Sequence, residues 1–191
     1  HMDLDLGAVR STDDFYTGTV AAACGGTTTI VDHMAFGPEG CSIGHQVVAY
    51  HQLADNKAVI DYGFHGVMDH VDDFILNELD DLISQGITSH KIYLTYDGKV
   101  SDGEALRLLE RTRELGVLVA VHPENDGGIH YLKKKFKAAG KIAPIYHARS
   151  RPPELEAEAI NRMVLLASVA RDAPLYIVHL TNQLGMEFVR S

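Results

Sequence analysis

The sequence is poor in the residues that mark several large classes of protein. It has only two cysteines, Cys24 and Cys41, among 191 residues, and these supply neither a disulfide framework nor a pair spaced for a metal ion. No apolar run approaches the roughly 20 residues that span a bilayer. No positively charged leader precedes the first predicted element. We therefore expect a protein of the reducing cytoplasm with no membrane partner.

Basic residues are also scarce. The chain has 17 lysines and arginines against 26 aspartates and glutamates, which gives a formal net charge of -9. Proteins that bind nucleic acids concentrate positive charge to displace counterions from phosphates. One basic cluster is present, and on a helix its members spread around most of the circumference, which is typical of a solvated face; they are Lys133, Lys134, Lys135 and Lys137. We expect no nucleic-acid partner.

The sequence does have a regular alternation of short β-branched runs with amphipathic stretches. This alternation is typical of βα units that build a parallel sheet. The predicted strands are 27–31, 58–64, 89–94, 117–121 and 174–178, with room for one more upstream of residue 1. The first predicted helix runs through residues 21–23; Ser11 and Asp14 cap it, and Gly25 and Gly26 end it. The other predicted helices are 42–54, 72–85, 102–115, 129–138 and 154–170.

The pattern favours an α/β fold without choosing between its two main forms. The run 117–121 is apolar on both faces, as in a parallel strand covered on both sides by helices. Doubly wound sheets and barrels share this local pattern. A nucleotide-binding fold would place a glycine-rich turn after its first strand, whereas Gly25 and Gly26 precede a strand. The long polar segment 125–151 is of a kind that commonly shapes a site or an oligomer contact.

Histidines stand where four of the predicted strands end, and they are His33, His65, His122 and His179. Catalytic groups of α/β barrels gather at this edge, although any single histidine there can be structural. His122 and His179 are the stronger candidates, because each is the first polar residue after an uninterrupted apolar strand. We expect both imidazoles to point into the end of the fold that is shielded from water, where they can bind zinc or a similar ion.

Lys91 is unusual because it lies inside a strand that the pattern buries. A buried lysine is costly unless it is paired or chemically changed. One interpretation is that the side chain snorkels outward. The other is that its deprotonated amine serves as a base, as a nucleophile, or as a carbamate formed with carbon dioxide. A carbamate is a carboxylate on a long arm that can bridge two cations.

Several stretches, in order along the chain, resemble the hydantoinase and dihydropyrimidinase branch of the cyclic amidohydrolases. They are DDFYTGT at 13–19, AAACGGTTTIVD at 21–32, KIYLTY at 91–96, VHPEN at 121–125, APIYHARSRP at 143–152 and APLYIVHL at 173–180. The resemblance covers essentially the whole chain. Residues 33–34 and 64–67 are most similar to the phenylhydantoinases.

The resemblance implies an incomplete TIM (β/α)₈ barrel. Residues 1–191 would form one partial barrel domain with about strands 1 to 6, cut at both ends and without the last strands and the β-sandwich domain. It also implies a site with two divalent metal ions, expected to be zinc. The residues assigned to it are His1, as the second member of a His-x-His pair, Lys91, as a bridging carboxylated lysine, His122 and His179.

Some positions depart from the family pattern or lie outside the chain. The first histidine of the pair and the catalytic aspartate lie beyond the two ends of this sequence. His33 and His65 are not ligand positions in the family, so we assign them structural roles. The residues after His1 resemble those that follow the pair in phenylhydantoinases, which favours a native histidine over the remnant of a purification tag.

The implied reaction is hydrolytic opening of cyclic amides, hydantoins or dihydropyrimidines, to N-carbamoyl amino acids. The resemblance implies that Tyr96 donates a hydrogen bond to the developing oxyanion. It also implies that Tyr93, together with loops 3–9 and 97–101, shapes the substrate pocket. It implies a tetramer for the full-length protein, whereas we expect the 191-residue chain itself to be inactive.

Two alternatives remain. The first is a non-catalytic dihydropyrimidinase-related scaffold protein, against which the presence of Lys91, His122 and His179 argues. The second is another cyclic amidohydrolase, an allantoinase or a dihydroorotase, which the stretches 15–19 and 122–125 make less favoured.

Overall fold

A computed structural model describes residues 1–5, 9–38 and 40–191 of the chain. Part of the predicted pocket loop 3–9 therefore lies outside the described residues. The chain divides into two compact units, His1–Lys91 and Ile92–Ser191. Within the described part of the chain, no helix is both long and apolar enough to cross a membrane.

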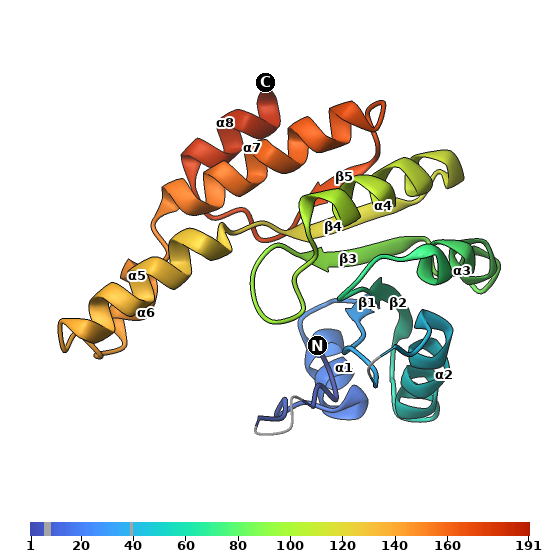
Figure 1. Cartoon of the computed structure of the whole chain (residues 1–191). Coiled ribbons are helices and arrows are strands. Elements are labelled where there is room, and N and C mark those ends of the chain that lie inside the picture. The colour runs from blue at the N-terminus through green and yellow to red at the C-terminus, as the bar shows by residue number, and fades with distance from the viewer. Residues whose placement is uncertain (6–8, 39) are drawn as a thin grey trace. The chain divides into compact units, whose positions relative to one another are not determined.

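The first unit alternates helices and parallel strands (Figure 1). Its elements are α1 (Phe15–Cys24), β1 (Thr29–His33), α2 (Ile43–Ala54), β2 (Asp61–Val67), α3 (Asp73–Ser84) and the first three residues of β3 (Ser89–Tyr93). β2 pairs in parallel with both neighbours, with Val31 opposite Gly63 and Gly66 opposite His90. The strand order in this unit is β1-β2-β3.

Aromatic rings form the core of the first unit. Phe15 of α1, Tyr50 of α2 and Phe64 of β2 are buried, and each pair meets edge to face with centroids 5.8 to 6.2 Å apart. Edge-to-face contacts add to the free energy gained by burying the rings. This cluster joins two helices to β2, the strand that carries His65.

The start of α1 differs in detail from the prediction. Asp14 caps the helix, because its carboxylate accepts a hydrogen bond from the Thr17 amide at 2.8 Å. Ser11 does not share that role: its hydroxyl donates to the Asp13 carbonyl and accepts from the Leu4 amide, both at 3.0 Å. Ser11 therefore ties down the segment before the helix instead of capping it.

The second unit continues the alternation after the end of β3. It contains α4 (Asp102–Leu115), β4 (Leu118–His122), α5 (Asp126–Ala138), α6 (Ile145–Arg149), α7 (Pro153–Val169), β5 (Leu175–Ile177) and α8 (Gln183–Arg190). The strand order is β3-β4-β5, with β4 and β5 parallel. Figure 1 shows α8, in red, lying beside α7, in orange.

The interior of β4 is buried on both faces, as predicted. Val119, Ala120 and Val121 are at most 1% exposed. An α/β chain with parallel strands is therefore confirmed. The basic cluster of α5 is exposed at every lysine, which also agrees with the prediction.

Several boundaries differ from the predicted ones. β2 begins and ends three residues later than expected, so His65 lies within the strand and not after it. α5 begins at Asp126, three residues early, because the Asn125 side chain accepts a hydrogen bond from the Gly128 amide at 2.9 Å. The short helix α6 and the helix α8 were not predicted.

Candidate active site

Two of the predicted ligands come together in the second unit. His122 is the last residue of β4, and His179 follows β5 by two residues. The neighbouring strands place Val121 opposite Ile177, which brings the two histidines to the same strand edge. Nδ1 of His122 lies 2.8 Å from Nε2 of His179. The His122 side chain is 13% exposed, but His179 is exposed. The prediction that both imidazoles point into a site shielded from water is therefore wrong for His179.

The other ring nitrogen of His122 contacts a carboxylate. Nε2 of His122 lies 2.8 Å from Oε2 of Glu124, and the second oxygen of that carboxylate lies 3.4 Å from Nε of Arg151. Burial raises the pKa of Glu124, but the hydrogen bond and charge of His122 and the charge of Arg151 outweigh burial and lower it overall. The carboxylate is therefore ionised at neutral pH.

Both predicted tyrosines stand beside the His122 ring. The ring centroid of Tyr96 is 5.2 Å from that of His122, and the centroid of Tyr93 is 5.9 Å away. Burial and the charge of Glu124 raise the pKa of Tyr96, with Arg151 opposing them. The Tyr96 phenol therefore keeps its proton at neutral pH and can donate a hydrogen bond.

The backbone is unusual at two of these positions. Tyr96 has φ of 75° and His179 has φ of 38°, values that are uncommon for residues other than glycine. Such conformations cost free energy and gather at functional sites, where the surroundings enforce them. Sequence patterns carry no direct signal of this feature.

These side chains line a pocket of about 190 Å³. The lining residues are Tyr96, His122, Pro123, Glu124, His147, Arg151, Glu156, His179 and Thr181. The pocket thus unites three predicted site residues, while Tyr93 is placed beside it by its ring contacts. The prediction missed Glu124 and Arg151, although both lie in motifs that carry the family resemblance.

Glu156 of α7 also contributes to the pocket by holding the loop after His179. Its carboxylate accepts hydrogen bonds from the Thr181 amide at 3.1 Å, from the Thr181 hydroxyl, and from the Asn182 side chain at 2.7 Å. Since Asn182 caps α8, the same carboxylate links α7 to the start of the next helix. This was not predicted.

In the first unit, Lys91 is 3% exposed. Outward snorkelling, one of the two interpretations of its position, is therefore wrong. Burial lowers the pKa of its amine to about 8, so part of the Lys91 side-chain population is neutral near pH 7. The neutral amine is the form that reacts with carbon dioxide, so the environment of Lys91 suits a carbamate.

Three histidines of the first unit stack in a row. The ring centroids of His1 and His33 are 5.0 Å apart, and those of His33 and His65 are 4.6 Å apart. Nδ1 of His1 lies 3.1 Å from the His33 carbonyl oxygen, and Nδ1 of His65 lies 2.5 Å from the Ser89 hydroxyl. Burial and the charge of Lys91 lower the pKa of His65. These contacts suit structural roles for His33 and His65.

The donor atoms fit a metal ion in part. Among the described residues, no group of three or more histidine, cysteine, aspartate or glutamate side chains is gathered closely enough to hold an ion. The second unit supplies two converging imidazole nitrogens from His122 and His179, and neutral imidazole is a preferred zinc ligand. The described residues of the second unit therefore supply two ligands for an ion.

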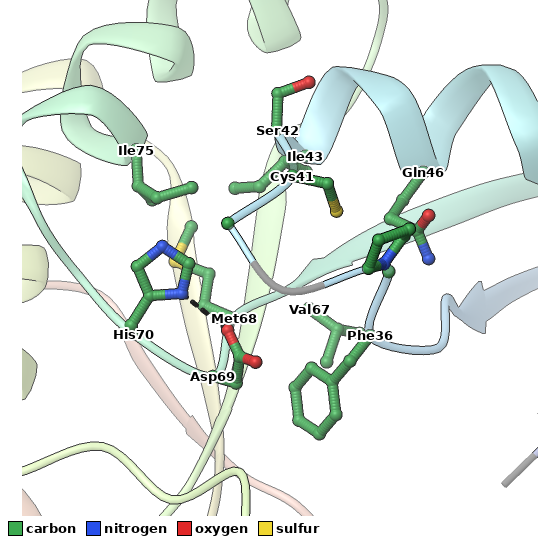
Figure 2. A pocket seen from close by; sticks show the side chains of 13 residues that line it. Phe36, Cys41, Ser42, Ile43, Gln46, Val67, Met68, Asp69, His70 and Ile75 are labelled. Atoms are coloured by element: carbon green, nitrogen blue, oxygen red, sulfur yellow. Dashed lines mark hydrogen bonds and ion pairs between the residues drawn. The ribbon is translucent and has the colours of Figure 1, made fainter.

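Figure 2 shows a second pocket, which lies in the first unit and is lined in part by Cys41, Gln46, Asp69 and His70. Its volume of about 20 Å³ leaves room for little more than a water molecule. Nδ1 of His70 lies 2.6 Å from Oδ1 of Asp69. Burial, followed by the charges of Asp69 and Glu78, raises the pKa of the Cys41 thiol. A thiol that keeps its proton is a poor nucleophile.

Comparison with known proteins agrees with the motifs, although no family model matches the chain. The chain is 55% identical over 190 residues to the D-phenylhydantoinase of Escherichia coli O1:K1, an alignment that covers 100% of this chain and 41% of that protein. It superposes on the dihydropyrimidinase of Brevibacillus agri NCHU1002 with a TM-score of 0.95, at 41% identity over 100% of this chain and 41% of the other.

A D-hydantoinase from Bacillus sp. AR9 gives the same TM-score of 0.95, at 42% identity over 99% of this chain and 42% of that one. The predicted resemblance is confirmed in sequence and in structure. The chain spans about 41% of the length of the curated relatives that it matches.

Proposed function

We propose that this chain, which belongs to the hydantoinase and dihydropyrimidinase family, forms part of a hydrolase that opens cyclic amide rings to N-carbamoyl amino acids. The observation that carries the proposal is the convergence of His122, His179 and Tyr96 on one pocket. Two imidazoles suited to a metal ion and a protonated phenol are groups that can support hydrolysis of an amide, by binding an ion that activates water and by donating a hydrogen bond to the oxyanion.

His1, Lys91, His122 and His179 are the residues that we propose as ligands of two divalent ions, expected to be zinc. When bound, such ions supply hydroxide at neutral pH by lowering the pKa of a coordinated water. Lys91 would take part as a carbamate: its neutral amine forms a bond to the carbon of carbon dioxide and releases one proton, which leaves a carboxylate at the end of the side chain.

The proposed role of Tyr96 is to stabilise the oxyanion that develops on the attacked carbonyl. Its phenol keeps its proton at neutral pH, and its surroundings raise its pKa further; a donor held in place before the reaction stabilises that charge without reorganisation. Tyr93, whose ring centroid is 6.2 Å from that of Tyr96, would contact the ring substituent of the substrate, together with the loop 97–101.

Several finer features belong to the same proposal. They are a (β/α)₈ barrel to which this chain contributes about strands 1 to 6, a tetrameric full-length protein and a cytoplasmic location. The 191-residue chain alone would be inactive, because the resemblance places one metal ligand and the catalytic aspartate outside it. An incomplete site would leave the attacking water without activation.

The test is a ring-opening assay on the full-length protein that carries this sequence. We expect turnover of 5-phenylhydantoin, because the 55% identical relative is a D-phenylhydantoinase, and of dihydrouracil, because a similar solved structure is that of a dihydropyrimidinase. Allantoin and dihydroorotate serve as substrates of the alternative cyclic amidohydrolases. Preference for either of them would contradict the proposed substrate class, and no turnover of any ring would favour a scaffold protein.

A further inference from the structure

We infer that Asp126 is a positioning residue, whose carboxylate holds the turn that carries the Tyr96 phenol. It does so from both sides of the tyrosine, through Thr95 and Lys99. The inference deepens the proposed function and rests on it for its purpose, because Tyr96 is the proposed oxyanion donor. Its structural basis lies within the second unit and needs no substrate.

The carboxylate of Asp126 uses both of its oxygens on the segment around Tyr96. The Thr95 hydroxyl donates a hydrogen bond to Oδ1 at 3.0 Å, and Nζ of Lys99 lies 3.2 Å from Oδ2. Thr95 is 2% exposed, so its hydrogen bond is shielded from water and is stronger than the same bond at the surface. Since Thr95 comes directly before Tyr96 and Lys99 three residues after it, the two contacts bracket the tyrosine.

The turn at Tyr96 needs such support because its backbone is strained. Tyr96 has φ of 75°, a conformation that costs free energy and persists only where the surroundings enforce it. The Lys99 amide donates to the Tyr96 carbonyl at 3.3 Å, which closes the turn on itself. The Val100 amide donates to the Tyr93 carbonyl at 3.0 Å. The contacts with Asp126 join this closed turn to another element, α5.

Asp126 is itself held, because it is the first residue of α5 and the start of that helix is fixed against α7. The Asn125 amide donates to the Leu155 carbonyl at 3.1 Å, and the Asn125 side chain donates to the Glu158 carboxylate at 2.6 Å. Ile129, in the first turn of α5, is 1% exposed. A carboxylate on a fixed helix end can hold a functional side chain in one place.

The charge of Asp126 strengthens both contacts. Burial raises the pKa of this carboxyl. Hydrogen bonds with Lys99 and Thr95, together with the charges of Lys99 and His130, outweigh burial and lower the pKa overall. The carboxylate is therefore ionised at neutral pH, and hydrogen bonds to an ionised group are stronger than those between neutral groups.

The consequence is that Asp126 sets where the phenol lies beside His122. The ring centroid of Tyr96 is 5.2 Å from that of His122. A donor stabilises a developing charge from the position that the transition state requires, and a displacement of about 1 Å by a remote mutation can cost about 100-fold in rate. Loss of Asp126 should therefore lower kcat and leave KM nearly unchanged, because the oxyanion forms only in the transition state.

The test is a double-mutant cycle on the full-length protein, with ring opening of 5-phenylhydantoin as the readout. Asp126→Ala should lower kcat by about 10- to 100-fold when Tyr96 is present. It should lower kcat by no more than about twofold in Tyr96→Phe, where the donor is already gone. A residue that only stabilises the fold would lower kcat by the same factor in both backgrounds.

Two further variants complete the cycle. Asp126→Asn keeps an acceptor for Thr95 but loses the charge that pairs with Lys99, so it should lower kcat less, and it replaces Asp126→Ala if that variant does not fold. Glu114→Ala removes an exposed ion pair with Arg111 and should leave kcat unchanged. Equal factors in both backgrounds would overturn the inference, as would a wild-type kcat in both Asp126 variants.

The second readout needs no turnover. Hydrogen exchange of peptides that cover residues 95–101 of the full-length protein should be faster in Asp126→Ala than in the wild type, because the turn loses its tie to α5. Unchanged exchange would overturn the inference and leave the proposed function intact. If the wild type opens no ring yet the exchange is faster as expected, Asp126 still positions Tyr96 and the proposed function fails.

Discussion

Nδ1 of His122 and Nε2 of His179 lie 2.8 Å apart, although 57 residues separate them in the sequence. His122 is the last residue of β4 and His179 follows β5 by two residues, and the parallel pairing of β4 with β5 makes those two strand ends neighbours. Parallel strands all end at the same edge of a sheet, so residues at their carboxyl ends are brought together whatever lies between them in sequence. The candidate site is a direct result of this topology.

Replacement of either histidine should weaken metal binding. We expect His122→Asn and His179→Asn in the full-length protein each to lower the affinity for Zn²⁺ by at least about 10-fold, because each removes a nitrogen donor from the proposed site. Isothermal titration with Zn²⁺ measures the effect. His130→Asn is the control, since His130 is 62% exposed on α5; an equal loss in all three variants would point to nonspecific binding.

Removal of the buried amine of Lys91 should stabilise the chain. Its folded-state pKa of about 8 lies below its ordinary value of 10.5, so the folded chain binds this proton less tightly than the unfolded one. The contribution of the Lys91 amine to the free energy of unfolding is therefore lowest below pH 8 and rises with pH up to about 10.5. In buffer free of carbon dioxide, Lys91→Met should raise the free energy of unfolding at pH 7 by on the order of 3 kcal/mol.

Urea unfolding at pH 7 and pH 10 would measure both the gain and its dependence on pH. The advantage of Lys91→Met should shrink at the higher pH, because the wild-type amine is then largely neutral. Lys137→Met, at an exposed position of α5, should change stability little. If Lys91→Met were less stable than the wild type at pH 7, the desolvation account of Lys91 would be wrong.

A methyl group at Gly66 should disrupt the packing of β2 against β3. A Cβ at this position would lie 2.7 Å from Nδ1 of His90, whose ring is fully buried. Overpacking of this kind typically costs about 1 to 3 kcal/mol. Gly63→Ala on the same strand is the matched control, because no atom lies within 4 Å of its added Cβ. Thermal unfolding of both variants should show a loss in Gly66→Ala only.

The loop after His179 should depend on Glu156. Its carboxylate accepts three hydrogen bonds from Thr181 and Asn182, and hydrogen bonds to a charged group contribute more than those between neutral ones. We expect Glu156→Ala to cost about 1 to 3 kcal/mol of stability and to speed hydrogen exchange of the Thr181 amide. Unchanged exchange at that amide would show that other contacts hold the loop.

The sequence predicted much of the fold because the apolar runs and helix caps are strong local signals. The strand 117–121 and the helix 102–115 agree closely with β4 and α4, since burial on both faces and a Ser101 cap with an αL Gly116 leave little ambiguity. β2 was placed three residues early, because β-branched Val59 and Ile60 resemble strand residues although they precede the pairing.

The site was predictable where a strand end or a motif points to a residue. The places of His122 and His179 after apolar runs indicated both, Tyr96 was found through the resemblance, and the structure gathers all three at one pocket. The Glu124–Arg151 pair joins residues far apart in the sequence, and periodicity does not show which side chains meet after folding. The positive φ angles of Tyr96 and His179 were invisible for the same reason, because tertiary contacts impose them.

The measurement that tests the account most directly combines ring opening with elemental metal analysis of the full-length protein, as wild type and as Lys91→Ala. The account predicts about two divalent ions per chain and turnover of 5-phenylhydantoin in the wild type, with both lost in Lys91→Ala. A wild-type protein with neither metal nor turnover would contradict the proposed hydrolase, and full activity in Lys91→Ala would contradict the role of the carbamate.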